Sequence, residues 1–222
     1  MPEDMRHWTP CKRPSKIVME GRFVRLEPLS LSHTAELYAA SAIPDAHQRF
    51  MWLSEYAPSD PDDFTEWVNT AMNSTDPVYF AVIDKQSGTV GGRQTFMRID
   101  SANGVIETGS IYWGPLIARK AAATEALFLF AQHIFDELGY RRFEWKCNND
   151  NEPSKRAALR FGFQYEGTFR QHMIVKGVSR DTAWFAMTDK DWPKLRQRFQ
   201  NWLDPSNFDT DGQQKLRLQD CG

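Results

Sequence analysis

One stretch of the chain, residues 107–163, constrains the fold most, because it predicts a strand, a loop, a helix, a strand and a helix in succession. Residues 105–113 are rich in β-branched and aromatic side chains, which favour a strand, and Gly114-Pro115 ends it. After the loop, one apolar helix face is expected because apolar residues recur at steps of three and four. These residues are Ala123, Ala126, Leu127, Phe130, Ile134 and Leu138.

The stretch ends with a second strand and a second helix. Residues 142–147 favour the strand, and Gly139 before it suits the C-cap of the first helix. Asn151 is a good N-cap, Pro153 fits a first helical turn, and Gly162 marks the helix end. Upstream, residues 78–84 and 90–99 predict a hairpin that leads by a second turn into strand 105–113. Gly91-Gly92 predicts a bulge or a close approach there.

An antiparallel meander followed by a β-α-β-α segment defines an α+β chain with a mixed sheet. We also expect a strand at 21–27, helices from about 32 and over 62–72, and an aromatic loop between them. Strands are expected at 163–168, 171–176 and 182–187, with a helix at 189–203. The domain organisation is then an extended N-terminal arm (1–20), one domain (21–204) and a polar, loosely attached C-terminal tail (205–222).

Composition narrows the class of protein. The chain has 222 residues, of which 41% are hydrophobic and 25% charged, with a formal net charge of −2. These values are typical of a globular protein and predict neither nucleic acid nor membrane as a partner. Three cysteines without metal spacing suggest a reducing, cytoplasmic setting and no metal. Trp8 in the arm predicts packing on the domain or on a second subunit of a homodimer, although a disordered leader is an equal alternative.

The loop before the first long helix carries a second kind of signal. Helix N-termini bind phosphates, because their first N–H groups are unpaired and carry partial positive charge. The small residues Ala121, Ala122 and Ala123 would let a phosphate approach, and Arg119 and Lys120 add charge. On these residues alone, an ordinary βα crossover is the simpler interpretation.

The motifs of this stretch resemble those of the GNAT superfamily of acyl-CoA-dependent N-acyltransferases, in particular its RimJ/RimL-like branch. The family's pyrophosphate loop, Gln/Arg-x-x-Gly-x-Gly/Ala and often Thr-Glu-Ala, corresponds to residues 118–126, which read ARKAAATEA. The branch's Asn-x-x-Ser, Gly-Phe and Glu-Gly signals correspond to Asn151 with Ser154, to Gly162-Phe163 and to Glu166-Gly167. The first Gln/Arg and the central glycine are Ala118 and Ala121 here, and Arg119 can supply the missing cation.

The resemblance implies a GNAT-like fold in which an acyl-CoA, most simply acetyl-CoA, lies where two parallel strands splay apart. Those strands would be 105–113 and 142–147. The backbone around Ile111 and Trp113 would pair with the pantetheine arm, and Asn151 would contact that arm or cap its helix. The diphosphate would then lie on residues 119–124, that is on Arg119, Lys120, Ala121, Ala122, Ala123 and Thr124.

Two residues are expected to carry the chemistry. By resemblance, Ser154 protonates the leaving thiolate; the tyrosine that many relatives use a turn later is Ala158 here. Ser154 as a local helix-start residue is an equal alternative. Glu107, on the strand that borders the cleft, is the candidate general base. Its alternatives are a surface carboxylate paired to a cation, or Glu144 as the base.

Three other titratable residues fit structural roles better. His133 and His172 are expected to be satisfied structural histidines. Cys147 is expected to be a buried thiol, because the spacing of the chain suggests no partner histidine for it.

The expected function is acyl-CoA-dependent N-acyl transfer by direct attack of an amine in a ternary complex. A GNAT-fold CoA-binding or scaffolding module without catalysis is the alternative, favoured by Ala118 and Ala121. A succinyl donor would need an additional cation near the acyl end. The acceptor is expected to be a small-molecule amine or a protein N-terminus.

Overall fold

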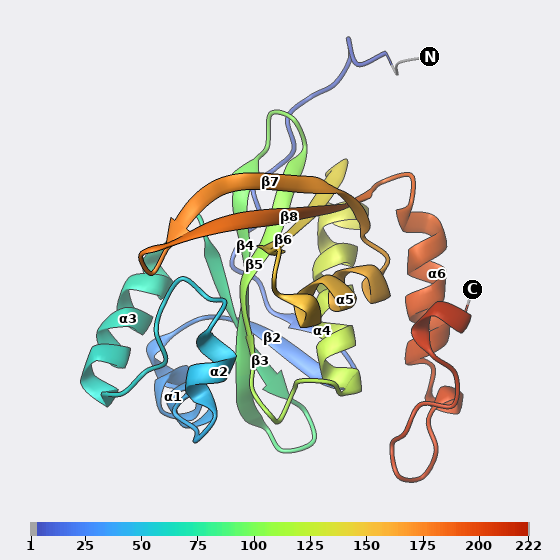
Figure 1. Cartoon of the computed structure of the whole chain (residues 1–222). Helices are drawn as coiled ribbons and strands as arrows, with labels where there is room; N and C mark the ends of the chain where they lie inside the picture. The colour runs from blue at the N-terminus through green and yellow to red at the C-terminus, as the bar shows by residue number, and fades with distance from the viewer. Residues whose placement is uncertain (1–3, 222) are drawn as a thin grey trace.

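The described residues, 4–221 of the computed structural model, form one eight-stranded sheet in the order β1-β2-β3-β4-β5-β6-β8-β7 (Figure 1). Neighbouring strands in this part of the chain are antiparallel, except for the parallel pair β5 and β6. This architecture confirms the predicted α+β class with a mixed, mostly antiparallel sheet. The strands are β1 (Met19–Glu20), β2 (Val24–Pro28), β3 (Val78–Asp84), β4 (Thr89–Asp100), β5 (Val105–Trp113), β6 (Arg142–Asn148), β7 (Gln164–Val175) and β8 (Val178–Thr188).

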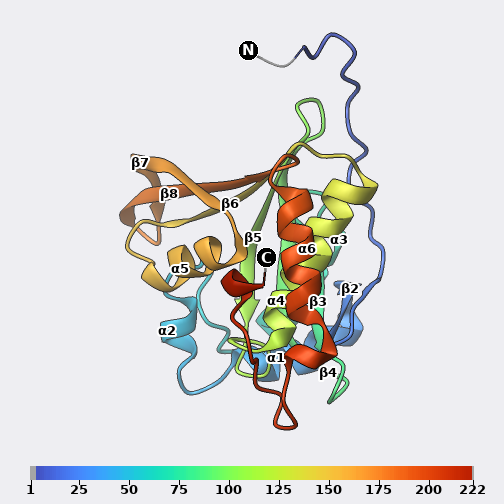
Figure 2. The ribbon, with the colours of Figure 1, turned by 90° about the vertical axis from the view of Figure 1, so that its right-hand side faces the viewer.

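Helices cover both faces of the sheet (Figures 1 and 2). Their bounds are α1 (Thr34–Ser41), α2 (Ala46–Phe50), α3 (Pro61–Asn73), α4 (Ala121–Gln132) with a π-helical turn His133–Glu137, α5 (Glu152–Phe161) and α6 (Trp192–Leu203). Short 3₁₀ turns span Leu31–His33, Pro205–Asn207 and Leu218–Asp220. Within residues 4–221, none of these helices combines the length and the apolar character needed to cross a membrane.

Two apolar cores hold the layers together. The larger one lies between the sheet and α4, where Phe96 stacks on Phe130 at 3.8 Å and Phe80 meets both rings edge-on at 5.3 to 5.7 Å between centroids. The smaller one lies under α1 and α3 and contains Leu37 and Val68, which are fully buried. Burial of apolar surface is the main driving force of folding, so the two cores hold the helices on the sheet. The sheet in turn positions the cavity described below.

The parallel strands β5 and β6 separate part of the way along their length. Within the described chain they pair only from Val105 opposite Arg142 to Thr108 opposite Trp145. Beyond that point β6 continues on β8, and β5 continues on β4. A β-bulge with Ser110 at φ 45° adds a residue to β5 at the divergence and bends the strand.

The β7–β8 hairpin reaches across to the helices that precede β3. At its turn, Lys176 Nζ donates to the Phe50 carbonyl at 2.9 Å and lies 4.7 Å from the Tyr56 ring centroid. The sequence predicted two strands here, whereas β7 is one continuous strand. A bulge with Gln171 at φ 50° interrupts its alternating pattern without ending the strand. The hairpin therefore forms one wall of the space beyond the diverging strands.

Described residues of both terminal segments pack on the domain. In the arm, Trp8 Nε1 donates to the Ala102 carbonyl at 2.7 Å and Cys11 N to the Ser101 carbonyl at 2.9 Å, which favours the packed arm over a disordered leader. The expectation of a loosely attached tail is wrong at Asn207, Leu218 and Cys221, which are buried, whereas residues 209–217 are exposed. Leu218 is only 1% exposed and joins the larger core, because apolar tail side chains find apolar partners there.

Candidate active site

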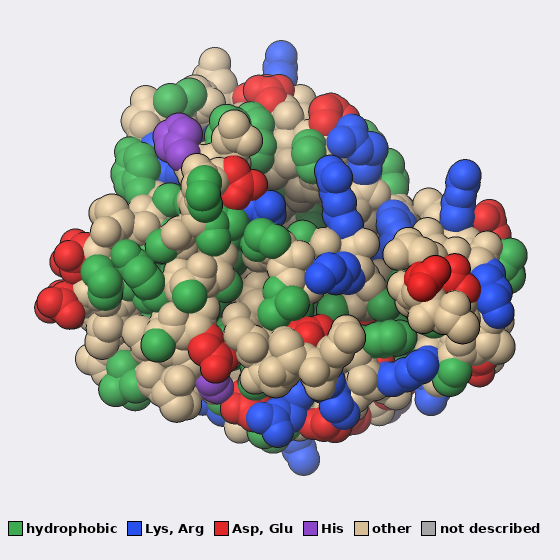
Figure 3. All heavy atoms as spheres, turned by 90° about the horizontal axis from the view of Figure 1, so that it is seen from below, with side chains coloured by type: hydrophobic (Ala, Val, Ile, Leu, Met, Phe, Trp, Pro, Cys, Tyr) green, Lys and Arg blue, Asp and Glu red, His purple; other side chains and the backbone are tan. Residues whose placement is uncertain are grey.

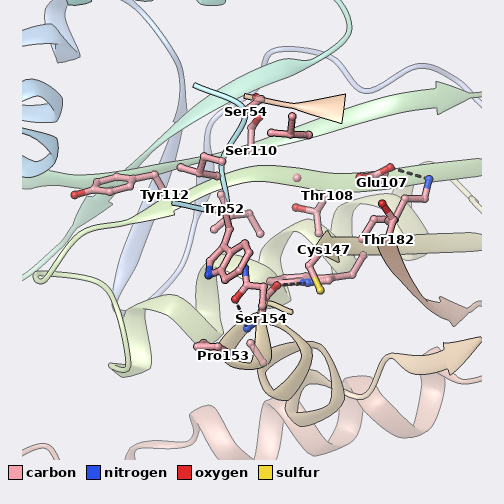
Figure 4. Close-up of a pocket in the computed structure, with 18 of the residues that line it drawn as sticks. Trp52, Ser54, Glu107, Thr108, Ser110, Tyr112, Cys147, Pro153, Ser154 and Thr182 are labelled. Atoms are coloured by element: carbon pink, nitrogen blue, oxygen red, sulfur yellow. Dashed lines mark hydrogen bonds and ion pairs between the residues drawn. The ribbon is translucent and has the colours of Figure 1, made fainter. Parts of the chain in front are cut away.

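A cavity of about 490 Å³ opens where β5 and β6 diverge. The start of α5 forms one side, and the segment after α2 together with β7 and β8 forms the other (Figure 4). The predicted site residues at this cavity are Glu107, Ile111, Trp113, Asn151 and Ser154. The strand divergence therefore produces the cleft that the sequence predicted.

The loop that leads into α4 presents backbone rather than side-chain donors. Arg119 has a left-handed backbone with φ 63°, and the Lys120 side chain makes no capping hydrogen bond in the described chain. The N–H groups of Ala121 and Ala122, first in the helix, have no intrahelical partner. Ala121 is the first residue of α4 and is not among the described residues with positive φ, so its place needs no glycine conformation. The loop can therefore receive a diphosphate with alanine at the family's glycine position.

Positive charge accompanies this loop. The side chains of Arg119 and Lys120 are exposed and face solvent beside the helix start. Seen from below, the molecule shows grouped Lys and Arg side chains on the face where this end of the structure lies (Figure 3). Such charge favours a polyanionic group near the α4 N-terminus.

Two glycines of β4 let the loop pack closely on the sheet. A Cβ on Gly91 would lie 2.5 Å from Ile117 Cγ1, and one on Gly92 would lie 2.3 Å from the Tyr112 carbonyl oxygen. Both distances are too short for a side chain. The close approach predicted for this glycine pair is confirmed, and it places the loop against the sheet edge.

The first turns of α4 are used by the fold as well as by the site. The side chains of Ala122, Ala123 and Thr124 are buried, so the helix start offers a partner its backbone. Thr124 Oγ1 accepts a hydrogen bond from Arg160 Nη1 at 3.0 Å. The next residue, Glu125, accepts three backbone N–H groups of residues 22–24 at 2.5 to 2.9 Å. The Thr-Glu pair thus ties α4 to α5 and β2.

Beyond the bulge, β5 borders the cavity with backbone that β6 does not pair in the described chain. Ile111 and Trp113 are half-buried there. Trp113 Nε1 donates to Gln94 Oε1 at 3.2 Å, and Ser110 O accepts from Arg93 Nη1 at 2.6 Å. These bonds fix the edge of β5, so that its free N–H and C=O groups can pair with an extended ligand.

Ser154 lies in the first turn of α5 and faces the cavity (Figure 4). Asn151 Oδ1 accepts its backbone N–H at 3.1 Å, which is the predicted N-cap. Trp145 Nε1 donates to Ser154 Oγ at 3.0 Å. Because the hydroxyl accepts this bond, its own proton is available to a group in the cavity. The geometry allows both the capping role at the backbone and a donor role at the side chain.

Glu107 is a buried member of an ion-pair network. It is only 4% exposed, with Oε2 lying 2.8 Å from Lys146 Nζ and 3.6 Å from Arg98 Nη1. Burial raises the pKa of Glu107, and the attraction of Lys146 partly opposes that shift. The prediction of a surface carboxylate is wrong, although the cation pairing is present. A carboxylate of raised pKa at a cavity wall is suited to accepting a proton.

The alternatives to these two residues are placed less favourably. Glu144 Oε2 lies 2.7 Å from Lys146 Nζ, the same ammonium that contacts Glu107, and Glu144 is also paired with Arg142. Glu144 does not line the cavity. His133 is buried and bonded to Glu137, and His172 is bonded to Thr182. Cys147 is buried, as expected, and this burial raises the pKa of its thiol. Within residues 4–221, no group of three His, Cys, Asp or Glu side chains is arranged to hold a metal.

Sequence reasoning missed two contributors to the cavity. Trp145 supplies the hydrogen bond to Ser154, and Arg180 lines the cavity from β8. Trp52, from the aromatic loop expected between the first two helices, also lines the cavity. The strand expected from residue 182 begins already at Val178, so Arg180 lies within β8. Arg180 is remote in sequence from the motifs, and Trp145 lies on a strand whose pattern does not tell which helix side chain its indole N–H contacts.

Comparison with known proteins agrees with this geometry. Residues 24–164 match the acetyltransferase (GNAT) domain. A GCN5-related N-acetyltransferase from Brucella melitensis is 60% identical, covers 96% of this chain and 97% of that one, and superposes with a TM-score of 0.95. A probable GNAT-family acetyltransferase from Chromobacterium violaceum is 34% identical over 87% of this chain and 96% of its own, with a TM-score of 0.80. The uncharacterized N-acetyltransferase p20 of Bacillus licheniformis is 28% identical over 60% of this chain and 75% of its own length.

The chain therefore belongs to the GNAT acetyltransferase family. Its activity is acetyl-CoA-dependent N-acetyl transfer, as the sequence predicted, and nothing in the comparisons favours the inactive module.

Proposed function

We propose that the cavity binds acetyl-CoA with its diphosphate at the start of α4 and its thioester between β5 and β6. The observation that carries this proposal is the divergence of the two parallel strands with Ser154 facing the gap. The amine acceptor enters from the opposite side, between the segment after α2 and the β7–β8 hairpin. Attack is direct, in a ternary complex, which gains its rate from alignment of the two reactants.

The residues present fit this ligand. Unpaired N–H groups at Ala121 and Ala122 suit a diphosphate, and Arg119 and Lys120 lie beside them. The unpaired edge of β5 suits the amides of a pantetheine arm. Bound acetyl-CoA supplies an acyl group activated as a thioester, and all other functions fall to the chain itself.

Two side chains serve proton transfer in this proposal. Ser154 donates its hydroxyl proton to the leaving sulfur, because Trp145 already occupies an acceptor site of that hydroxyl. Glu107 takes the proton of the attacking amine, directly or through water, since burial raises its pKa towards that task. The N–H groups of β5 beyond the bulge face the thioester carbonyl and stabilise charge on its oxygen.

The finer placement in the RimJ/RimL-like branch rests on Asn151 and Ser154. Asn151 caps α5 and thereby sets the position of Ser154, as an Asn-x-x-Ser unit at a cleft requires. The acceptor class is a primary amine, on a small molecule or at a protein N-terminus.

Calorimetry of the purified chain with acetyl-CoA tests the donor, and release of free CoA in an amine screen tests transfer. We expect binding in the micromolar range and CoA release only when an acceptor is present. Absence of binding at millimolar acetyl-CoA would contradict the proposal. Binding with thioester hydrolysis but no acylated amine would contradict the transfer step alone.

A further inference from the structure

Arg180 is a charged side chain without a partner. Within residues 4–221, its guanidinium makes no hydrogen bond and no ion pair, and its Nε is fully buried. Other arginines near the cavity are engaged. Arg93 is paired with Glu55, and Arg98 lies 3.6 Å from Glu107. The side chain as a whole is half-buried, and a buried N–H without a partner is costly unless an acceptor reaches it, so this arginine requires a functional explanation.

Arg180 lies at the acceptor end of the cavity. It lines the cavity from β8 together with Thr182, which is paired in register with Asn148 of β6. Burial lowers the pKa of Arg180, while the nearby Cys147 and Glu107 act in the opposite direction. Cys147 and Glu107 line the same cavity as Ser154. The guanidinium is therefore close to the reacting centre and remote from the exposed diphosphate loop.

The charges around the cavity leave Arg180 as the uncompensated one. Its lining includes four cations and one carboxylate, which are Arg49, Arg98, Lys146, Arg180 and Glu107. Arg49 is paired with Asp45 at 2.9 Å. Arg98 and Lys146 both contact Glu107, and Lys146 also contacts Glu144. Among the described lining cations, only Arg180 remains to bind a negative group from outside the chain.

We propose that Arg180 binds a carboxylate of the acceptor, so that the natural acceptor is a small amine that carries a carboxylate. A guanidinium presents parallel N–H donors that match a carboxylate in bidentate geometry. The acetyl group has no charge, and the diphosphate binds at the other end, so the acceptor is the reactant that supplies the anion. This inference rests on the proposed function, since it assumes acetyl transfer in this cavity.

Matched acceptors test the inference. The acceptors are proteinogenic α-amino acids and ω-amino acids. Each free acid is compared with the carboxamide of the same compound in the CoA-release assay, using the full chain. We expect kcat/KM to be at least tenfold higher for the carboxylate member of the accepted pairs. In Arg180→Gln this preference falls to near unity, while kcat/KM for the carboxamide and KM for acetyl-CoA stay unchanged. Arg180→Lys retains part of the preference, and Arg217→Gln, an exposed arginine of the tail, retains all of it.

Thermal unfolding separates this role from a structural one. Because Arg180 has no partner within residues 4–221, Arg180→Gln should leave Tm unchanged or raise it. A lowered Tm together with equal loss for both members of a pair would overturn the inference. The inference would also be overturned if no acceptor pair showed a preference for the carboxylate member. The same holds if the wild type preferred succinyl-CoA to acetyl-CoA and Arg180→Gln removed that preference. If calorimetry on the same preparation shows no acetyl-CoA binding, the proposed function itself fails.

Discussion

The two ends of the cavity are built on different principles. At the donor end, the start of α4 offers backbone N–H groups, and the side chains of Ala122 and Ala123 are turned into the core. At the acceptor end, the wall includes charged side chains from four strands, namely Arg98, Glu107, Lys146 and Arg180, with Lys146 bonded to both Glu107 and Glu144. A backbone site depends on local conformation, whereas a side-chain site depends on which distant segments meet.

This difference predicts how each end responds to substitution. Backbone donors survive most side-chain changes, so the donor end tolerates alanine at a position where the family has glycine. The side chains of the acceptor end have individual tasks in a low-dielectric setting, where loss of one group has large consequences. Effects on catalysis should therefore be largest for Ser154 and Glu107 and smallest in the diphosphate loop.

The largest effect is expected for Ser154→Ala, the one substitution at the junction of the two ends. Loss of the proton donor should lower kcat about 100-fold, with KM for acetyl-CoA changed less than about twofold. Stopped assays of CoA release give both constants. Ser179→Ala, an exposed serine on β8, is the matched control and should behave as wild type. An unchanged kcat in Ser154→Ala would leave Ser154 with its helix-start role alone.

An intermediate effect is expected for Glu107→Gln. We expect kcat/KM to fall about tenfold at neutral pH, as is usual for a general base that water can partly replace. In the wild type, kcat/KM should fall as the pH drops through the pKa of Glu107, which burial raises above the ordinary 4.5 of a glutamate. This acidic limb should be absent in Glu107→Gln.

The matched control for this variant is Glu144→Gln, which removes a carboxylate from the same Lys146 without touching the cavity wall. It should keep the acidic limb of the pH profile. If both variants lose the limb, the titration belongs to the ion-pair network rather than to Glu107 as the base.

The contrast between the two ends also explains what the sequence could predict. The strand-loop-helix order and the Asn151 cap depend on residues close together in the chain, and the structure confirms them. The burial of Glu107 depends on Lys146 and Arg98, which the fold brings from β6 and β4. Periodicity records which face of an element is apolar, but not which charged residues of separate strands meet. The packing of Leu218 was missed because a single apolar residue in a polar tail has no periodicity to show which surface it contacts.

The smallest effect is expected for Arg119→Gly, which tests the donor end alone. Arg119 has φ 63°, a conformation that costs a side-chain-bearing residue about 1 kcal/mol relative to glycine. The variant should therefore unfold at slightly higher denaturant concentration. KM for acetyl-CoA should rise only about threefold, because one exposed cation is lost while the N–H groups remain. Arg119→Lys keeps the charge and the strain, so it should show neither change. A KM raised more than about thirtyfold in Arg119→Gly would mean that the donor end, like the acceptor end, depends on its side chains.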